Sequence, residues 1–146
     1  MTDVQPRSIA ALLGIKSRAG AFSFLDLANE VAKGLSALAV DRVCGMIAPA
    51  EPALRYKVVS RATLARRQAS ATSRLSREES DRVARLARLW TFATDVWGSE
   101  QEARRFLAEP HPLLGGRVPR DVAIETEIGA RAVEDLLGRL KYGSAA

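Results

Sequence analysis

Residues 76–97 read SREESDRVARLARLWTFATDVW, and this stretch decides the fold class. Apolar side chains recur in it every three or four residues, which is the spacing of one face of an α-helix. They include Val83, Leu86, Trp90, Ala93 and Trp97. Ser76 and Glu79 have the spacing of a capping box, in which each side chain binds the backbone N–H of the other residue. The stretch therefore predicts a helix over residues 77–97 that ends at Gly98 and packs both tryptophans inside.

Further helices are predicted downstream of this one. Ser99 and Glu102 form a second capping box, which opens a helix that runs through Ala108. Pro119 suits the first position of a short helix. A last helix is predicted over residues 127–141 and ends at Gly143. The apolar residues expected on it are Ile128, Ala130, Val133, Leu136, Leu137 and Leu140.

Short helices are also predicted upstream, over residues 7–13, 24–33, 37–48, 53–58 and 61–69. Their expected N-caps include Ser23, Ser36 and Ser60. The apolar side of the second of these helices is predicted to carry Leu25, Ala28, Val31 and Ala32, and that of the third Leu38, Val43, Met46 and Ile47. No segment alternates apolar and polar residues as a strand would, so we predict an all-α fold.

The net charge of +5 is concentrated in the N-terminal half. Residues 1–75 carry 11 Lys/Arg and 5 Asp/Glu, whereas residues 76–146 carry 11 and 12. No acidic residue lies between Glu51 and Glu78. A clustered basic stretch is typical of a phosphate-binding surface, although a solvated face of an arginine-rich chain would have the same composition.

The order of the predicted helices over residues 38–69 is that of a helix-turn-helix, whose second helix enters the major groove of DNA. Leu64 would then face the core, while Arg61, Thr63 and Gln68 would reach base edges, since Arg suits guanine and Gln suits adenine. Phosphate contacts would come from Arg66, Arg67 and Arg74. The turn holds Val58-Val59-Ser60 and no glycine, and a β-branched residue resists positive φ. A small helical bundle with a solvated basic face is the alternative.

Enzymatic and metal-centred functions have little support in the sequence. With one cysteine, Cys44, and one histidine, His111, the chain cannot form an internal disulfide and can hardly build a Cys/His metal site. Gly115-Gly116 is not followed by Lys and then Ser or Thr, as a Walker-type phosphate loop requires. We therefore expect no catalytic residue, no metal, no cofactor and no enzyme.

The sequence also lacks the marks of a membrane or exported protein. No apolar run approaches the about 20 residues that span a bilayer. The first residues contain no apolar stretch of the signal-peptide type. We therefore expect a cytoplasmic protein with no membrane partner.

The C-terminal half resembles a known family through several motifs in a fixed order. The motifs are Leu75-Ser76-Arg77-Glu78-Glu79-Ser80-Asp81-Arg82, Arg85-Leu86-Ala87-Arg88-Leu89, Glu102-Ala103-Arg104-Arg105-Phe106-Leu107, Leu113-Leu114-Gly115-Gly116, Thr126-Glu127-Ile128-Gly129-Ala130-Arg131 and residues 133–140. Over residues 74–143 they resemble the toxin-binding domain of the MbcA/ParS/Xre antitoxins. Residues 60–67 resemble the recognition-helix segment of the Xre-like part. Phe106 stands where the family often has Trp.

The resemblance implies a type II antitoxin whose partner is a RES-domain toxin, an enzyme that consumes or transfers from NAD. It also implies that the C-terminal helix and tail block the toxin's active site, and that the antitoxin forms a homodimer and binds its own promoter. The toxin-facing residues implied by position are Leu137, Arg139, Leu140, Lys141, Tyr142 and Gly143. Tyr142 could be an interface anchor or could fold back on the core, and Lys141 could pair with an acid or complement the helix dipole.

We divide the chain into an N-terminal segment (1–20), an Xre-like helix-turn-helix domain (21–74) and a toxin-binding domain (75–146). Two other functions remain open on the sequence. One is a stand-alone transcription regulator without a toxin partner. The other is a pure inhibitor that has lost DNA binding.

Overall fold

The computed structural model describes residues 4–143, and its regular elements are helices. In chain order they are α1 (Pro6–Leu12), α2 (Phe24–Ala32), α3 (Leu38–Ile47), η1 (Pro52–Leu54), α4 (Arg55–Val58), α5 (Arg61–Ala69), α6 (Arg77–Trp97), α7 (Glu100–Ala108), η2 (Pro112–Leu114), α8 (Pro119–Glu125) and α9 (Glu127–Tyr142). Within residues 4–143 there is no β-strand, only two isolated bridges. The all-α prediction is confirmed. None of these helices is long and apolar enough to cross a membrane.

The described chain forms two compact units: residues 5–87, and residues 88–143 together with Val4. The division falls inside α6. The N-terminal unit contains α1 to α5 and the first half of α6. The C-terminal unit contains the rest of α6 and α7 to α9.

The N-terminal unit is built around the inward faces of short helices. Its core side chains include Ile9, Leu13, Val31, Val40, Val43, Ile47, Leu54, Val58, Val59, Leu64, Val83 and Leu86. A backbone pairing closes the unit, because the Ala37 N–H donates to the Ser73 carbonyl (2.7 Å) and the Leu75 N–H donates to the Leu35 carbonyl (2.8 Å). The linker after α5 is thus tied to the segment that precedes α3.

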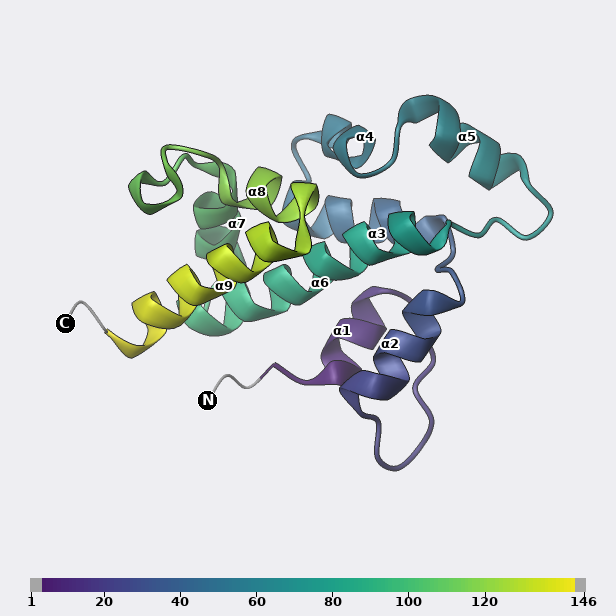
Figure 1. Ribbon diagram of the computed structural model, residues 1–146, viewed down its shortest axis with the longest axis horizontal. Coiled ribbons are helices and arrows are strands. Elements are labelled where there is room, and N and C mark those ends of the chain that lie inside the picture. The colour runs from purple at the N-terminus through teal and green to yellow at the C-terminus, as the bar shows by residue number, and fades with distance from the viewer. Residues whose placement is uncertain (1–3, 144–146) are drawn as a thin grey trace. The chain divides into compact units, whose positions relative to one another are not determined.

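The C-terminal unit depends on a close approach of α8 and α9, which lie side by side in Figure 1. A Cβ atom added at Gly129 would lie 2.3 Å from the Val122 carbonyl oxygen, so only glycine permits this approach. Arg88 on α6 also binds α9, since its guanidinium lies 2.9 Å from Glu134 and 2.6 Å from Glu127. Burial acts to lower the pKa of Arg88, but these two carboxylates outweigh it and raise that pKa.

Several buried faces differ from those predicted. In α2 the buried residues are Leu27 and Val31, whereas Leu25 is exposed. Leu38 at the start of α3 is exposed too, and α3 has no side-chain N-cap. Ile128 is 82% exposed because Gly129 and Ala130 turn the opposite side of α9 toward α8. Trp90 is buried as predicted, but Trp97 is 39% exposed.

The approach of α8 to α9 gives a stability prediction. Gly129→Ala forces a methyl group against the Val122 carbonyl, and we expect it to lower the free energy of unfolding by about 1–3 kcal/mol. The matched control is Gly138→Ala in the same helix, where the added Cβ meets nothing within 4 Å. Because alanine favours helix, this control should be neutral or stabilising by up to about 1 kcal/mol. Urea unfolding followed by circular dichroism measures both, and equal stability of the two variants would contradict the prediction.

Candidate functional site

Helix α5, predicted as the recognition helix, begins and ends at the predicted residues. The Ser60 hydroxyl caps it by accepting the Thr63 N–H (3.3 Å), and Leu64 is the buried residue of this helix. Val59 carries the chain from α4 into α5 in an extended conformation, with φ −135°. The turn therefore needs no residue with positive φ, which accounts for valines where a glycine would otherwise be required.

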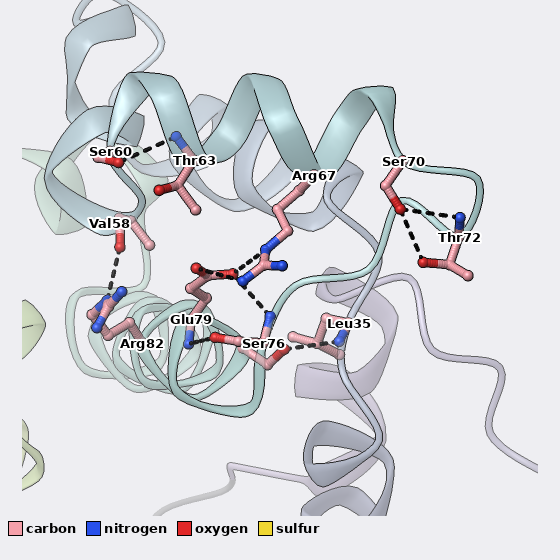
Figure 2. Close-up of polar contacts among 11 residues, drawn as sticks. Leu35, Val58, Ser60, Thr63, Arg67, Ser70, Thr72, Ser76, Glu79 and Arg82 are labelled. Atoms are coloured by element: carbon pink, nitrogen blue, oxygen red, sulfur yellow. Dashed lines mark hydrogen bonds and ion pairs between the residues drawn. The ribbon is translucent and has the colours of Figure 1, made fainter.

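A single carboxylate fixes α5 against the start of α6. Glu79 accepts two bonds from the Arg67 guanidinium, at 3.0 and 3.3 Å (Figure 2). The same carboxylate accepts the Ser76 N–H at 2.8 Å, and the Glu79 N–H donates to the Ser76 hydroxyl at 3.1 Å. This reciprocal pair is the capping box that the sequence predicts. Its partnership with Arg67, twelve residues upstream, is an additional contact.

Two further bonds surround this contact in Figure 2. The fully buried Ser80 hydroxyl accepts the Leu35 N–H at 2.9 Å, and the Arg82 side chain donates to the Val58 carbonyl at 2.8 Å. The first turns of α6 therefore hold the end of α4, the body of α5 and the segment before α3. The orientation of α5 depends on these polar contacts together with the burial of Leu64.

The predicted DNA-binding residues fall into two groups. Arg61, Arg66 and Gln68 are exposed on α5. Arg67 is engaged by Glu79, and one Arg74 nitrogen donates to the Gly34 carbonyl at 2.7 Å. Thr63 is half-buried beside the Ser60 cap. The exposed positively charged surface of α5 thus consists of Arg61 and Arg66.

Arg61 has a neighbour that the sequence analysis missed. Its guanidinium lies over the Tyr56 ring, 4.1 Å from the centroid, and donates to the Tyr56 hydroxyl at 3.3 Å. Arg55 approaches the same ring at 5.0 Å and pairs with Asp41 at 3.0 Å. Stacking on an aromatic face holds a guanidinium in place while its charge stays available. The i,i+5 spacing of Tyr56 and Arg61 across a turn is too irregular to be recognised without coordinates.

The C-terminal end of α9 presents part of the predicted toxin-facing set. Leu140 is 42% and Tyr142 54% exposed, and Arg139 and Gly143 are exposed as well. Gly143 ends the helix in the left-handed conformation (φ +60°), as expected for a C-cap. Two members have internal partners instead. Leu137 is fully buried, and Lys141 forms an ion pair with Asp95 of α6.

Leu140 also lines a shallow recess of about 200 Å³ in the C-terminal unit. Aromatic rings gather there, since the Trp97 and Phe106 centroids are 6.0 Å apart and His111 meets the edge of Phe106 at 5.9 Å. The His111 Nδ1 accepts the Leu113 N–H at 3.1 Å, so this histidine caps the turn that follows. Within residues 4–143 no cluster of three or more His, Cys, Asp or Glu side chains could hold a metal ion.

The chain is similar to known proteins in sequence. Residues 92–143 match the model of the antitoxin Xre/MbcA/ParS C-terminal toxin-binding domain. A protein of Yersinia enterocolitica named antitoxin Xre is 34% identical over 119 residues, which cover 80% of this chain and 79% of that relative. The chain belongs to the Xre/MbcA/ParS antitoxin family. A second antitoxin Xre, from Photorhabdus laumondii, is 32% identical over 78 residues, covering 53% of this chain and 52% of that relative.

The family membership predicted from the motifs is therefore confirmed. The match to the family model takes in the last turns of α6 and the whole of α7 to α9, including the exposed end of α9. The protein is an antitoxin of a toxin–antitoxin system, with a toxin-binding domain at its C-terminal end.

The Glu79 contact makes the antitoxin sensitive to acid. Burial acts to raise the pKa of Glu79, but the bonds from Arg67 and Ser76 outweigh it and hold that pKa below its ordinary value. A carboxylate whose pKa is lower in the folded state stabilises the protein fully above its unfolded pKa of about 4.3, and the gain is lost as pH falls through the folded value.

We expect Glu79→Gln to lower the free energy of unfolding by about 1–3 kcal/mol at pH 7, because Arg67 and the Ser76 N–H lose a charged acceptor. The deficit should shrink as pH falls below about 4, where the native carboxylate is itself protonated. Thermal unfolding between about pH 3 and pH 7 measures it. The control is Glu78→Gln, an exposed neighbour in the same turn. A deficit that stays constant across this range would contradict the assignment.

Proposed function

We propose that this antitoxin neutralises a RES-type, NAD-consuming toxin through the exposed end of α9, and that α5 binds operator DNA and thereby represses its own operon. The toxin type follows from the resemblance of the C-terminal motifs to MbcA/ParS/Xre antitoxins. One observation supports the division of labour: exposed cations lie on α5, whereas exposed apolar side chains lie at the end of α9.

The end of α9 has the chemistry of a protein interface. Leu140 and Tyr142 expose apolar surface beside the Arg139 guanidinium, and aromatic and arginine side chains are enriched among interface residues that carry most of the binding energy. Leu137 supports this surface from inside, and the Lys141–Asp95 ion pair fixes the last turn of α9 on α6. We therefore assign toxin contact to Arg139, Leu140, Tyr142 and Gly143, and supporting roles to Leu137 and Lys141.

For DNA, α5 offers Arg61, Arg66 and Gln68 on an exposed face, and its N-terminus would lie toward the groove. Arg61 and Gln68 are suited to paired bonds with guanine and adenine. Arg67 acts indirectly by fixing α5 through Glu79, and Arg74 acts by tying the linker after α5 to Gly34 before α3. Thr63 lies beside the Ser60 cap, where its side chain is half-buried.

The wider assignment follows from these two activities. We propose a homodimer, as the resemblance implies, because a two-fold protein places two recognition helices on two half-sites. A DNA target and an NAD-consuming toxin both place the antitoxin in the cytoplasm. It inhibits by stoichiometric binding and has no catalytic activity of its own. Residues 21–74 would form the DNA-binding domain and residues 75–146 the toxin-binding domain.

Toxin neutralisation is tested by co-expression with the protein encoded by the adjacent gene. Leu140→Asp and Tyr142→Ala should each weaken the complex at least about tenfold, because a buried apolar contact contributes about 1.5–3 kcal/mol. Growth arrest by the neighbour should then return. The matched control is Ile128→Asp at the other end of α9, whose side chain is 82% exposed.

Full neutralisation by both Leu140→Asp and Tyr142→Ala would show that the inhibitory surface lies elsewhere. A neighbour that neither arrests growth nor co-purifies would instead favour a stand-alone transcription regulator. The basic surface of α5 favours that second function as much as it favours autoregulation.

Operator binding is tested with Arg61→Ala and Arg66→Ala in the full chain. Each should weaken binding to promoter DNA, and Arg66→Ala should lower the salt slope by about one phosphate contact. Arg131→Ala on α9, with a side chain 75% exposed, is the control. Neutralisation should persist in all three variants, so a parallel loss of both activities in folded protein would contradict two separate surfaces. If the unaltered antitoxin binds no DNA, or binds it independently of salt, the result would favour the alternative function of a pure inhibitor that has lost DNA binding.

A further inference from the structure

The N-terminal unit contains a recess of about 490 Å³ that the proposed roles of α5 and α9 do not use. The segment after α1 forms one wall, and the start of α3 together with the linker after α5 forms the others. Its lining includes Gly14, Lys16, Ser36, Arg42, Thr72 and Arg74. All of these residues belong to the same compact unit.

The recess is strongly positive. Lys16, Arg42 and Arg74 line it, while Glu30 is its one acidic lining residue, and the Glu30 carboxylate lies 3.4 Å from the Lys33 ammonium. Among residues 4–143, no carboxylate lies within ion-pair distance of Lys16 or Arg42. Three cations converging on one cavity repel one another, so the arrangement favours an anionic ligand.

Two of the cations lie against the backbone, and one of them is bound to it. The Arg42 guanidinium lies against Gly14, where an added Cβ atom would come within 2.0 Å of one of its nitrogens, and the φ of +73° at Gly14 favours glycine. One Arg74 nitrogen is bound to the Gly34 carbonyl at 2.7 Å, which leaves its other N–H groups for a ligand. Guanidinium groups bind tetrahedral oxyanions well, because their donors match the spacing of the oxygens.

Neutral donors complete the lining. The Ser36 and Thr72 hydroxyls can each donate to an anion oxygen. We propose that this recess binds a phosphate group, with Lys16, Arg42 and Arg74 neutralising its charge and the two hydroxyls donating to its oxygens. The phosphate belongs either to a free phosphorylated molecule or to the backbone of bound DNA. Only the second source rests on the proposed function.

Occupancy of the recess would act on α5 through the linker. Thr72 and Arg74 lie in the linker that follows α5, and this linker is tied to the segment before α3 by the Ala37–Ser73 and Leu75–Leu35 backbone bonds. A phosphate bridging Arg42 of α3 and Arg74 of the linker would strengthen the same connection. Binding should therefore reduce the mobility of the C-terminal end of α5.

The test uses the full-length antitoxin and two probes. Inorganic phosphate is titrated at constant ionic strength, with chloride as the replaced ion, while the backbone amides of Ser36 and Thr72 are followed by NMR. A mixed-sequence duplex of about 20 base pairs, or two helical turns, is titrated at several salt concentrations. Both titrations are repeated with Lys16→Gln/Arg42→Gln and with the control Arg131→Ala. Lys16→Glu alone serves as a second variant in case the loss of Arg42 disturbs folding.

Saturable shifts at Ser36 and Thr72, weakened at least about fivefold in the double variant and in Lys16→Glu, would assign a free phosphate ligand. Absence of these shifts, with a DNA salt slope lowered by about two in the double variant, would assign the DNA backbone. If free phosphate binds but the duplex does not, the proposal of a phosphate-binding recess would stand and the proposal of operator binding would be overturned. Neither effect, or phosphate shifts scattered equally over the unit, would overturn the recess proposal.

Discussion

The buried carboxylate of Glu79 is the contact on which the N-terminal unit depends. It is 8% exposed, and withdrawing a carboxylate from water costs several kcal/mol unless charged and hydrogen-bonding partners replace the solvent. Arg67 and the Ser76 N–H supply those partners, so one group both begins α6 and fixes α5. Because the donors come from opposite sides of the linker at residues 70–75, this charge adds a direct connection between α5 and α6 to the burial of Leu64 and the Arg82–Val58 bond.

Where the determinants are local, the sequence predicts the structure closely. The bounds of α5, α6 and α7 agree with prediction because serine caps and terminating residues act within one helical turn. The buried faces of the short helices could not be predicted so well. In α2, Leu25 and Leu27 are equally apolar, and only the packing of the unit buries Leu27 and exposes Leu25. The exposure of Ile128 likewise follows from a backbone contact between α8 and α9.

In the candidate sites, too, features set by the local sequence could be predicted, whereas contacts between distant residues could not. The exposed positions of Arg61, Arg66 and Tyr142 follow from the polarity and period of their helices. The pairing of Arg67 with Glu79 and that of Lys141 with Asp95 join residues far apart in sequence or on different helices, and charge patterns alone admit many such pairs. Leu137 could have been placed inside from the sequence, since it lies four residues after the buried Val133. The recess beside α3 could not be predicted from the sequence, because three separate segments form it.

The placement of the tryptophans has a practical consequence. The chain has two, Trp90 and Trp97, and both lie in the C-terminal unit. Tryptophan fluorescence, excited at wavelengths that tyrosine does not absorb, therefore reports on that unit alone, whereas far-ultraviolet dichroism averages over the helices of both units. Any difference between the two unfolding curves would measure how independently the units melt. Trp97 is partly exposed next to Leu140, while Trp90 is buried, so a ligand at the end of α9 would change one emission component and leave the other as an internal reference.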